Sequence, residues 1–84
     1  MLNVTLNHSD TIEDLLPILE RAMETGEVCR VTNIEHFDLF EIAALRLLVG
    51  TGRLFDAANG QEFFARAGFQ LIGVDSAGDE HTLA

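Results

Sequence analysis

The first third of the chain changes from a strand-like to a helix-like pattern of apolar residues. Residues 2–6 alternate apolar and polar side chains, which is the period of a half-buried strand. In residues 11–25 the apolar side chains recur at helical intervals, with Asp10 placed to cap the first turn and Gly26 to end the last. We therefore expect a strand and then a helix, which kinks or begins late because Pro17 lacks a backbone donor.

The middle of the chain is the most apolar part. Residues 27–34 read as a strand with apolar side chains on both faces, hence a central strand. In the helix expected over 39–49, only Glu41 and Arg46 are polar, and they lie about 140° apart at about 100° per residue. A helix that is apolar nearly all round must be covered on more than one side. Either it binds a partner, or it is wedged between a sheet and a neighbouring helix.

The remaining residues predict two more strands and one more helix. We expect a short strand over 53–57, a helix over 59–68 that Asn59 caps, and a last strand over 69–74. Alternation of strands and helices predicts a small α/β domain with a mainly parallel four-stranded sheet and helices packed on it. We assign this single domain to residues 1–74 and expect 75–84 to be an acidic flexible tail.

Charge restricts the classes of partner. Fourteen acidic residues stand against five arginines and no lysine, which gives a net charge of −9. This field repels phosphate backbones and anionic headgroups, so we expect no nucleic-acid binding and no direct membrane binding. No apolar run approaches the roughly 18 residues of a membrane span, and we expect a cytoplasmic protein. The acids of residues 10–27 form either a solvated face or a docking face for a basic partner.

We find no set of residues that predicts catalysis. Cys29 is the only cysteine and lies in an apolar strand, where a thiol is usually inert, although His36 is a conceivable base for it. His8 and Asp10 flank a serine, but neighbours on a turn point apart and do not form a triad. The three histidines lack ligand spacing. We therefore expect no enzyme, no cofactor and no metal.

The stretch from residue 37 to 48 reads F-D-L-F-E-I-A-A-L-R-L-L and follows an apolar strand. It resembles the signature of STAS domains, the sulfate transporter and anti-sigma factor antagonist family, in which an aspartate precedes an apolar helix. Residues 57–69, A-A-N-G-Q-E-F-F-A-R-A-G-F, resemble the later strand and helix of that family. The resemblance covers residues 2–74 and implies a STAS-like fold with a role in signalling and transcription regulation.

The resemblance also implies a docking site at the start of this helix. Asp38 falls on the aspartate of the family, and Leu39 takes the position of the serine or threonine that a kinase phosphorylates in switched members. Leucine has no hydroxyl group, so this chain has no phospho-acceptor there. The expected partner-binding residues are Phe37, Asp38, Leu39, Phe40 and Glu41. Either two or three of Phe37, Leu39 and Phe40 are exposed, or both phenylalanines point into the core and only Leu39 is exposed.

The sequence thus predicts a non-catalytic protein-interaction module that binds through residues 37–45. The most specific form is an anti-sigma factor antagonist that binds a kinase-type anti-sigma partner and is never switched off by phosphorylation. Two alternatives remain open, an accessory subunit of a transporter ATPase and a small-ligand or lipid-binding domain. A homodimer through the apolar helix would satisfy the same need for burial.

Overall fold

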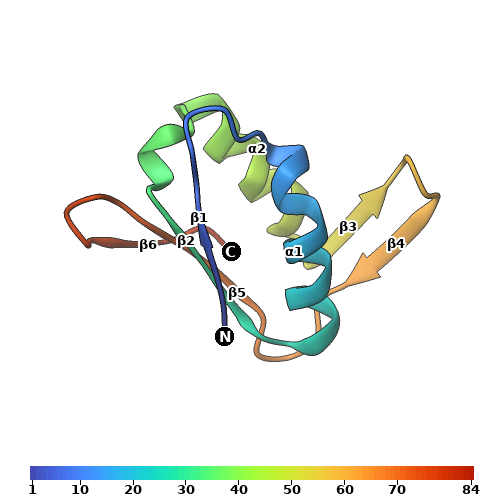
Figure 1. The fold of residues 1–84 in the computed structure, drawn as a ribbon. Helices are drawn as coiled ribbons and strands as arrows, with labels where there is room; N and C mark the ends of the chain where they lie inside the picture. The colour runs from blue at the N-terminus through green and yellow to red at the C-terminus, as the bar shows by residue number, and fades with distance from the viewer.

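The computed structural model describes all 84 residues, Met1–Ala84, and shows a small α/β domain (Figure 1). It contains two α-helices and one short 3-10 helix, η1, among six strands. In chain order the elements are β1 (Leu2–Thr5), α1 (Ile12–Thr25), β2 (Val28–Thr32), η1 (Ile34–His36), α2 (Leu39–Val49), β3 (Arg53–Asp56), β4 (Gln61–Phe64), β5 (Gln70–Val74) and β6 (Glu80–Thr82).

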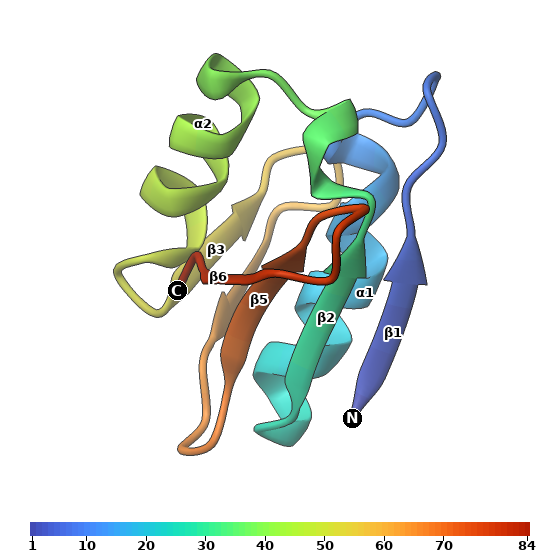
Figure 2. The same cartoon turned by 90° about the vertical axis from the view of Figure 1, so that its left-hand side faces the viewer.

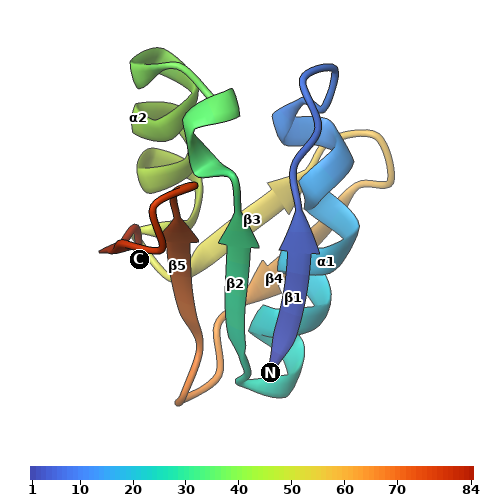
Figure 3. The same cartoon turned by 60° about the vertical axis from the view of Figure 1, so that its left-hand side comes forward.

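The strands form two separate sheets. In the larger sheet the order is β1-β2-β5-β6, with β1, β2 and β5 parallel and β6 antiparallel at the edge. Figure 3 shows the three parallel strands side by side. Strands β3 and β4 form an antiparallel hairpin of their own. The sheet is therefore mixed, and the prediction of a mainly parallel sheet that includes residues 53–57 is wrong.

Both helices and the hairpin lie on one side of the larger sheet (Figure 1). The register places Leu2, Cys29 and Leu71 side by side on the strand face that turns toward these helices. Central strand β2 buries Cys29 and Val31 and leaves its alternate residues half-buried. The expectation that β2 is central is confirmed, but the domain has two layers, and the second face of the sheet is not covered by a helix.

Local capping explains the limits of α1. The Asp14 carboxylate accepts the backbone N–H of Thr11 at 2.7 Å, so Thr11 is the N-cap and not Asp10. The helix continues through Pro17 to Thr25. Gly26 follows in the left-handed conformation, with φ at 70°, which confirms the predicted stop.

The predicted helix over residues 59–68 is wrong, because this segment is the turn and second strand of the hairpin. Asn59 and Gly60 lie in the connection between β3 and β4, and Gly60 has a positive φ of 64°. The Asp56 carboxylate accepts the backbone N–H of Ala58 at 3.0 Å and fixes this turn. Asn-Gly is a strong hairpin signal, and here it outweighs the capping spacing between Asn59 and Glu62.

The segment expected as a flexible tail carries the edge strand. Residues 80–82 pair with β5, and Leu83 is buried in the core. The backbone N–H of Leu83 donates to the carbonyl of Leu71 at 2.7 Å, and the N–H of Leu71 donates to Ala84 at 2.8 Å. Figure 2 shows β6 leading across the end of β5 toward α2. Its side chains at 80–82 are all exposed, so the apolar anchor is a single residue, Leu83.

Candidate functional site

A reciprocal hydrogen-bond pair fixes the start of α2. Asp38 accepts the backbone N–H of Glu41 at 2.8 Å, and Glu41 accepts the backbone N–H of Asp38 at 3.1 Å. This is a capping box, which satisfies two backbone donors and favours the helix start. Both carboxylates were predicted as partner contacts, and the structure gives them a local structural role. The spacing of Asp38 and Glu41 already contained that signal.

The first turn of α2 presents two large apolar side chains to solvent. Leu39 is 83% exposed and Phe40 is 87% exposed. Phe37, one residue before the cap, is only 3% exposed and belongs to the core. The prediction of Phe37 as a contact residue is therefore wrong: it anchors the turn, while the next two apolar residues point outward. Two of the three apolar residues, Leu39 and Phe40, are thus exposed, which is the first of the two expected arrangements.

The outward side of α2 remains apolar beyond its first turn. Leu45 and Val49 are the only fully buried residues of the helix, while Leu47 is 80% exposed. At about 100° per residue, four exposed apolar side chains fall within roughly a quarter to a third of the helix circumference. The helix is therefore covered on one side only, and not wedged between two elements. We call these residues the α2 outer face: Leu39, Phe40, Ala43 and Leu47.

The hairpin extends the apolar surface. Leu54 and Phe63 face each other across the strands and point inward, Leu54 fully buried and Phe63 half-buried. The alternate pairs point outward and form what we call the hairpin face: Arg53, Phe55, Glu62 and Phe64. A shallow groove joins this face to α2 and is lined by Leu47, Leu48, Thr51, Arg53, Phe55 and Glu62.

The hairpin face was not part of the predicted site. The sequence signal for this face is the alternation along residues 53–56, in which Leu54 is buried and Phe55 exposed. The two outward phenylalanines come from different strands, so both strands of the hairpin are needed to bring them to one face. A helix over 59–68, as predicted, excludes the second strand.

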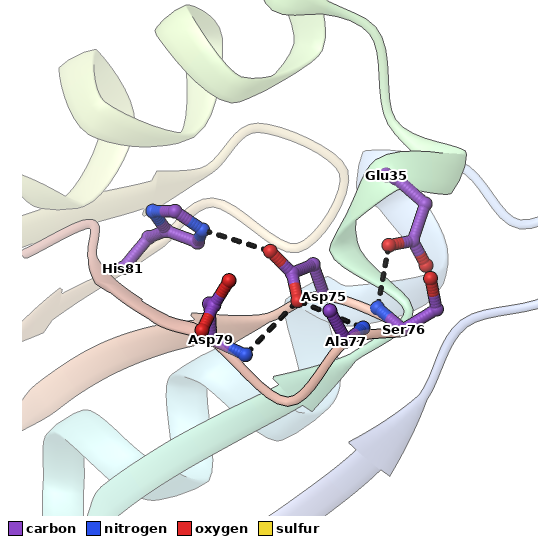
Figure 4. Close-up of polar contacts among 6 residues, drawn as sticks. All are labelled: Glu35, Asp75, Ser76, Ala77, Asp79 and His81. Atoms are coloured by element: carbon purple, nitrogen blue, oxygen red, sulfur yellow. Dashed lines mark hydrogen bonds and ion pairs between the residues drawn. The ribbon is translucent and has the colours of Figure 1, made fainter.

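A second hollow lies on the other side of α2, with a cavity volume of about 320 Å³. Its polar rim is ordered by the turn between β5 and β6 (Figure 4). Asp75 accepts the backbone N–H groups of Ala77 at 3.0 Å and Asp79 at 2.9 Å, and lies 3.2 Å from Nε2 of His81. The lining residues are Ile34, Glu35, Leu39, Ile42, Arg46, Asp75, His81 and Leu83.

The carboxylates at this hollow already have partners. The hydrogen bond from the Asp79 backbone, followed by that from His81, lowers the pKa of Asp75. Glu35 accepts the backbone N–H of Ser76 at 2.7 Å and ties the β5–β6 turn to η1. These contacts hold the turn in place and engage both carboxylates in hydrogen bonds.

The remaining titratable groups give no catalytic arrangement. Burial raises the pKa of the Cys29 thiol to about 11, so it is protonated at neutral pH and is a poor nucleophile. The rings of His8 and His36 lie 4.1 Å apart between their centroids, at a tilt of 59°. No group of three His, Cys, Asp or Glu side chains is placed to hold a metal ion.

Neither helix has the length and apolarity needed to cross a bilayer. Comparison with known proteins gave no match to a protein family, to a curated protein or to a solved structure. The features that bear on function are thus the α2 outer face, the hairpin face and the hollow beside the β5–β6 turn.

Proposed function

We propose that the chain is a non-catalytic protein-interaction module that binds a partner protein through the exposed apolar residues at the start of α2, Leu39 and Phe40. The observation that carries this proposal is the exposure of Leu39 and Phe40, two adjacent large apolar side chains on the first turn of a well-capped helix. Burying each of them would contribute roughly 1.5–3 kcal/mol before the costs of association. A capping box that orders the turn in advance lowers those costs, because less backbone freedom is lost on binding.

The resemblance to STAS domains supplies the more specific form of the proposal. In this form the partner is a kinase-type anti-sigma regulator that contacts the turn and helix after Asp38. Leu39 occupies the switch position and cannot be phosphorylated, so binding is constitutive. An accessory role on a transporter ATPase uses the same residues and differs only in which ATP-binding protein is bound.

A small-ligand function is a second candidate, and the hollow beside the β5–β6 turn favours it. Its volume lies at the lower end of the range for ligand pockets. Leu39 and Ile42 give it an apolar wall, and Arg46, which forms no ion pair, is a free cation at its edge. A small apolar molecule with a carboxylate group fits this combination. Native mass spectrometry of the purified protein would detect a retained molecule, and Arg46→Ala should abolish its retention.

The interaction proposal predicts that Leu39→Asp weakens partner binding at least about tenfold and leaves the melting temperature nearly unchanged, because an exposed side chain contributes little to the core. Tagged wild type and variant are used to capture proteins from extract of the source cell, and the retained proteins are identified. Thr5→Asp is the matched control, since it adds the same charge at an exposed position of β1.

Recovery of an ATP-binding regulatory kinase that Thr5→Asp retains and Leu39→Asp loses would support the specific form. Recovery of a transporter ATPase with the same pattern would move the proposal to the accessory-subunit form. Equal retention of every bound protein by the wild type and both variants would refute docking through Leu39.

A further inference from the structure

The hairpin formed by β3 and β4 is a two-stranded sheet that no third strand joins. Its inner side is anchored by Leu54 and Phe63, and its outer side carries Phe55 and Phe64, each 61% exposed. Figure 1 shows the hairpin projecting away from the larger sheet. Packing of Leu54 and Phe63 on the core stabilises the hairpin, but its strand edges stay open, and open edges with apolar side chains favour pairing with another chain.

The charge of the hairpin and its neighbouring residues indicates which kind of partner can bind the hairpin face. Between residues 39 and 66 there are three acidic residues and three arginines, so this segment is neutral in a chain whose net charge is −9. The charged members of the hairpin face are Arg53 and Glu62, which form an ion pair with each other. The Arg53 guanidinium also lies 5.8 Å from the centroid of the Phe64 ring.

A balanced patch of this kind is suited to self-association. In a two-fold interface the same patch meets itself, so a patch of one sign would repel its copy, whereas one arginine and one glutamate can exchange partners across the axis. Acidic residues of α1 border the patch, since Glu13 lines one hollow with Phe55 and Glu24 lines another with Phe64, and salt screens their repulsion across the interface. Within the patch itself the charges balance, so it gives a strongly basic or acidic partner no attraction.

We propose that two copies of this chain associate through the hairpin face and the adjoining Leu47 and Leu48, with Arg53 of one copy opposite Glu62 of the other. A standard interface needs about 800 Å² from each partner, roughly one-sixth of the 5097 Å² surface of this chain. The four apolar side chains Leu47, Leu48, Phe55 and Phe64 form its centre, and the charged pair orders the two copies.

This dimer does not depend on the proposed partner binding. Leu39 lies eight residues before Leu47, about 12 Å along the helix axis, so the first turn of α2 stays accessible at the rim. Absence of the dimer with partner capture intact would refute only the proposed dimer. Loss of partner capture with an intact dimer would refute only the proposed function.

Sedimentation equilibrium of the whole chain over a range of concentrations tests the proposal. We expect the wild type to approach twice its 9.2 kDa mass as concentration rises. Phe55→Asp should weaken dimerisation at least about 100-fold, because both copies lose an apolar anchor and gain a charge at the axis. Phe40→Asp is the control: Phe40 is 87% exposed against 61% for Phe55, lies about 10 Å along α2 from Leu47, and should leave the dimer intact.

A charge exchange tests the arrangement independently of the phenylalanines. Arg53→Glu makes the hairpin face doubly acidic and Glu62→Arg makes it doubly basic, so each variant alone should be a monomer. Mixed in equal amounts, they should form a one-to-one heterodimer, which differently tagged copies reveal. A wild type that stays monomeric up to about 1 mM would overturn the proposal, as would dimerisation that Phe40→Asp abolishes and Phe55→Asp does not. Failure of the mixed variants to associate would refute the Arg53–Glu62 contact.

Discussion

At the scale of single residues, Cys29 shows how position decides chemistry. It lies in the central strand with no exposed surface, between Leu2 of β1 and Leu71 of β5. The thiol therefore acts as a small apolar side chain, and burial raises its pKa from the ordinary value of 9.0 to about 11. The chain contains no lysine and no tyrosine, so Cys29 is the only side chain that titrates in the mildly alkaline range.

Because no other side chain titrates there, Cys29 alone should determine how the free energy of unfolding changes between pH 9 and pH 11. Between pH 9 and pH 11 the unfolded thiol loses its proton while the folded thiol keeps it. The unfolded state then binds fewer protons, so the free energy of unfolding should fall by about 1.4 kcal/mol per pH unit in this window and be unaffected below it. Urea unfolding at a series of pH values measures the slope. Cys29→Ala is the control and should show a flat profile. An unchanged slope in that variant would contradict the assignment.

Asp38, Glu41 and Gly68 have structural roles that depend on the residues they contact. Asp38 and Glu41 were predicted as contacts of a partner, and their mutual hydrogen bonds make them the helix cap. Gly68 was predicted to end a helix, and its φ of 100° instead lets its backbone approach Gly26, where a Cβ atom would lie 2.6 Å from the carbonyl oxygen. In both cases the residue type suggested a role, but the sequence did not show which atom the residue contacts.

At the scale of elements, β6 is the strand that closes the sheet. The Arg30 guanidinium of β2 binds Glu80 at 2.6 Å, and the backbone of residues 83 and 84 continues the pairing with Leu71. Leu83 is the one side chain of this segment that enters the core. The last ten residues are therefore held by one buried leucine, the Arg30–Glu80 ion pair, a short ladder of backbone hydrogen bonds and the hydrogen bonds of the β5–β6 turn.

Leu83→Ala should lower the free energy of unfolding by about 2–4 kcal/mol, because it removes buried methyl groups and leaves a cavity against Leu71. The neighbouring Thr82→Ala, at an exposed position of the same strand, should change it by less than about 0.5 kcal/mol. Chemical denaturation of both variants gives the comparison. Equal, small effects would show that the segment is a loose tail after all.

At the scale of the whole molecule, the net charge and the exposed apolar side chains come from different parts of the chain. The acidic residues concentrate on α1 and on the connections, while residues 39–66 have three acids against three arginines and carry the exposed leucines and phenylalanines. Self-repulsion in the acidic part opposes folding, and salt reduces it. Glu24 adds to the destabilisation, because it lies in the last turn of α1, where the helix dipole is negative and no basic residue compensates.

Glu24→Gln should therefore raise stability by about 0.3–1 kcal/mol at low ionic strength, with the gain disappearing at about 1 M salt. Melting temperatures of wild type and variant in dilute and in concentrated sodium chloride test this. The wild type itself should melt higher in salt. Glu13→Gln is the contrasting substitution, since Glu13 lies in the first turn of the same helix and its charge is favourable there. A gain from Glu13→Gln equal to that from Glu24→Gln would show that helix position has no influence.

The sequence by itself determined the elements whose pattern is local: β1, α1, β2, α2, β3 and β5, together with the α/β class and the stop at Gly26. It also showed that α2 is apolar around its circumference, and this prompted the prediction of a docking face. These features could be predicted because hydrophobic period and capping chemistry are read within a few residues.

Only the tertiary structure decided which apolar residues are exposed and which strands pair. Phe37 and Phe40 are the same residue type, but Phe37 lies before the helix cap and is buried, whereas Phe40 lies in the first turn of α2 and is exposed. The hairpin competes with a helix of similar local preference, and the packing of Leu54 and Phe63 against the core favours the hairpin. Strand β6 is short and polar, and it forms because the open edge of β5 supplies the backbone hydrogen-bond partners for it.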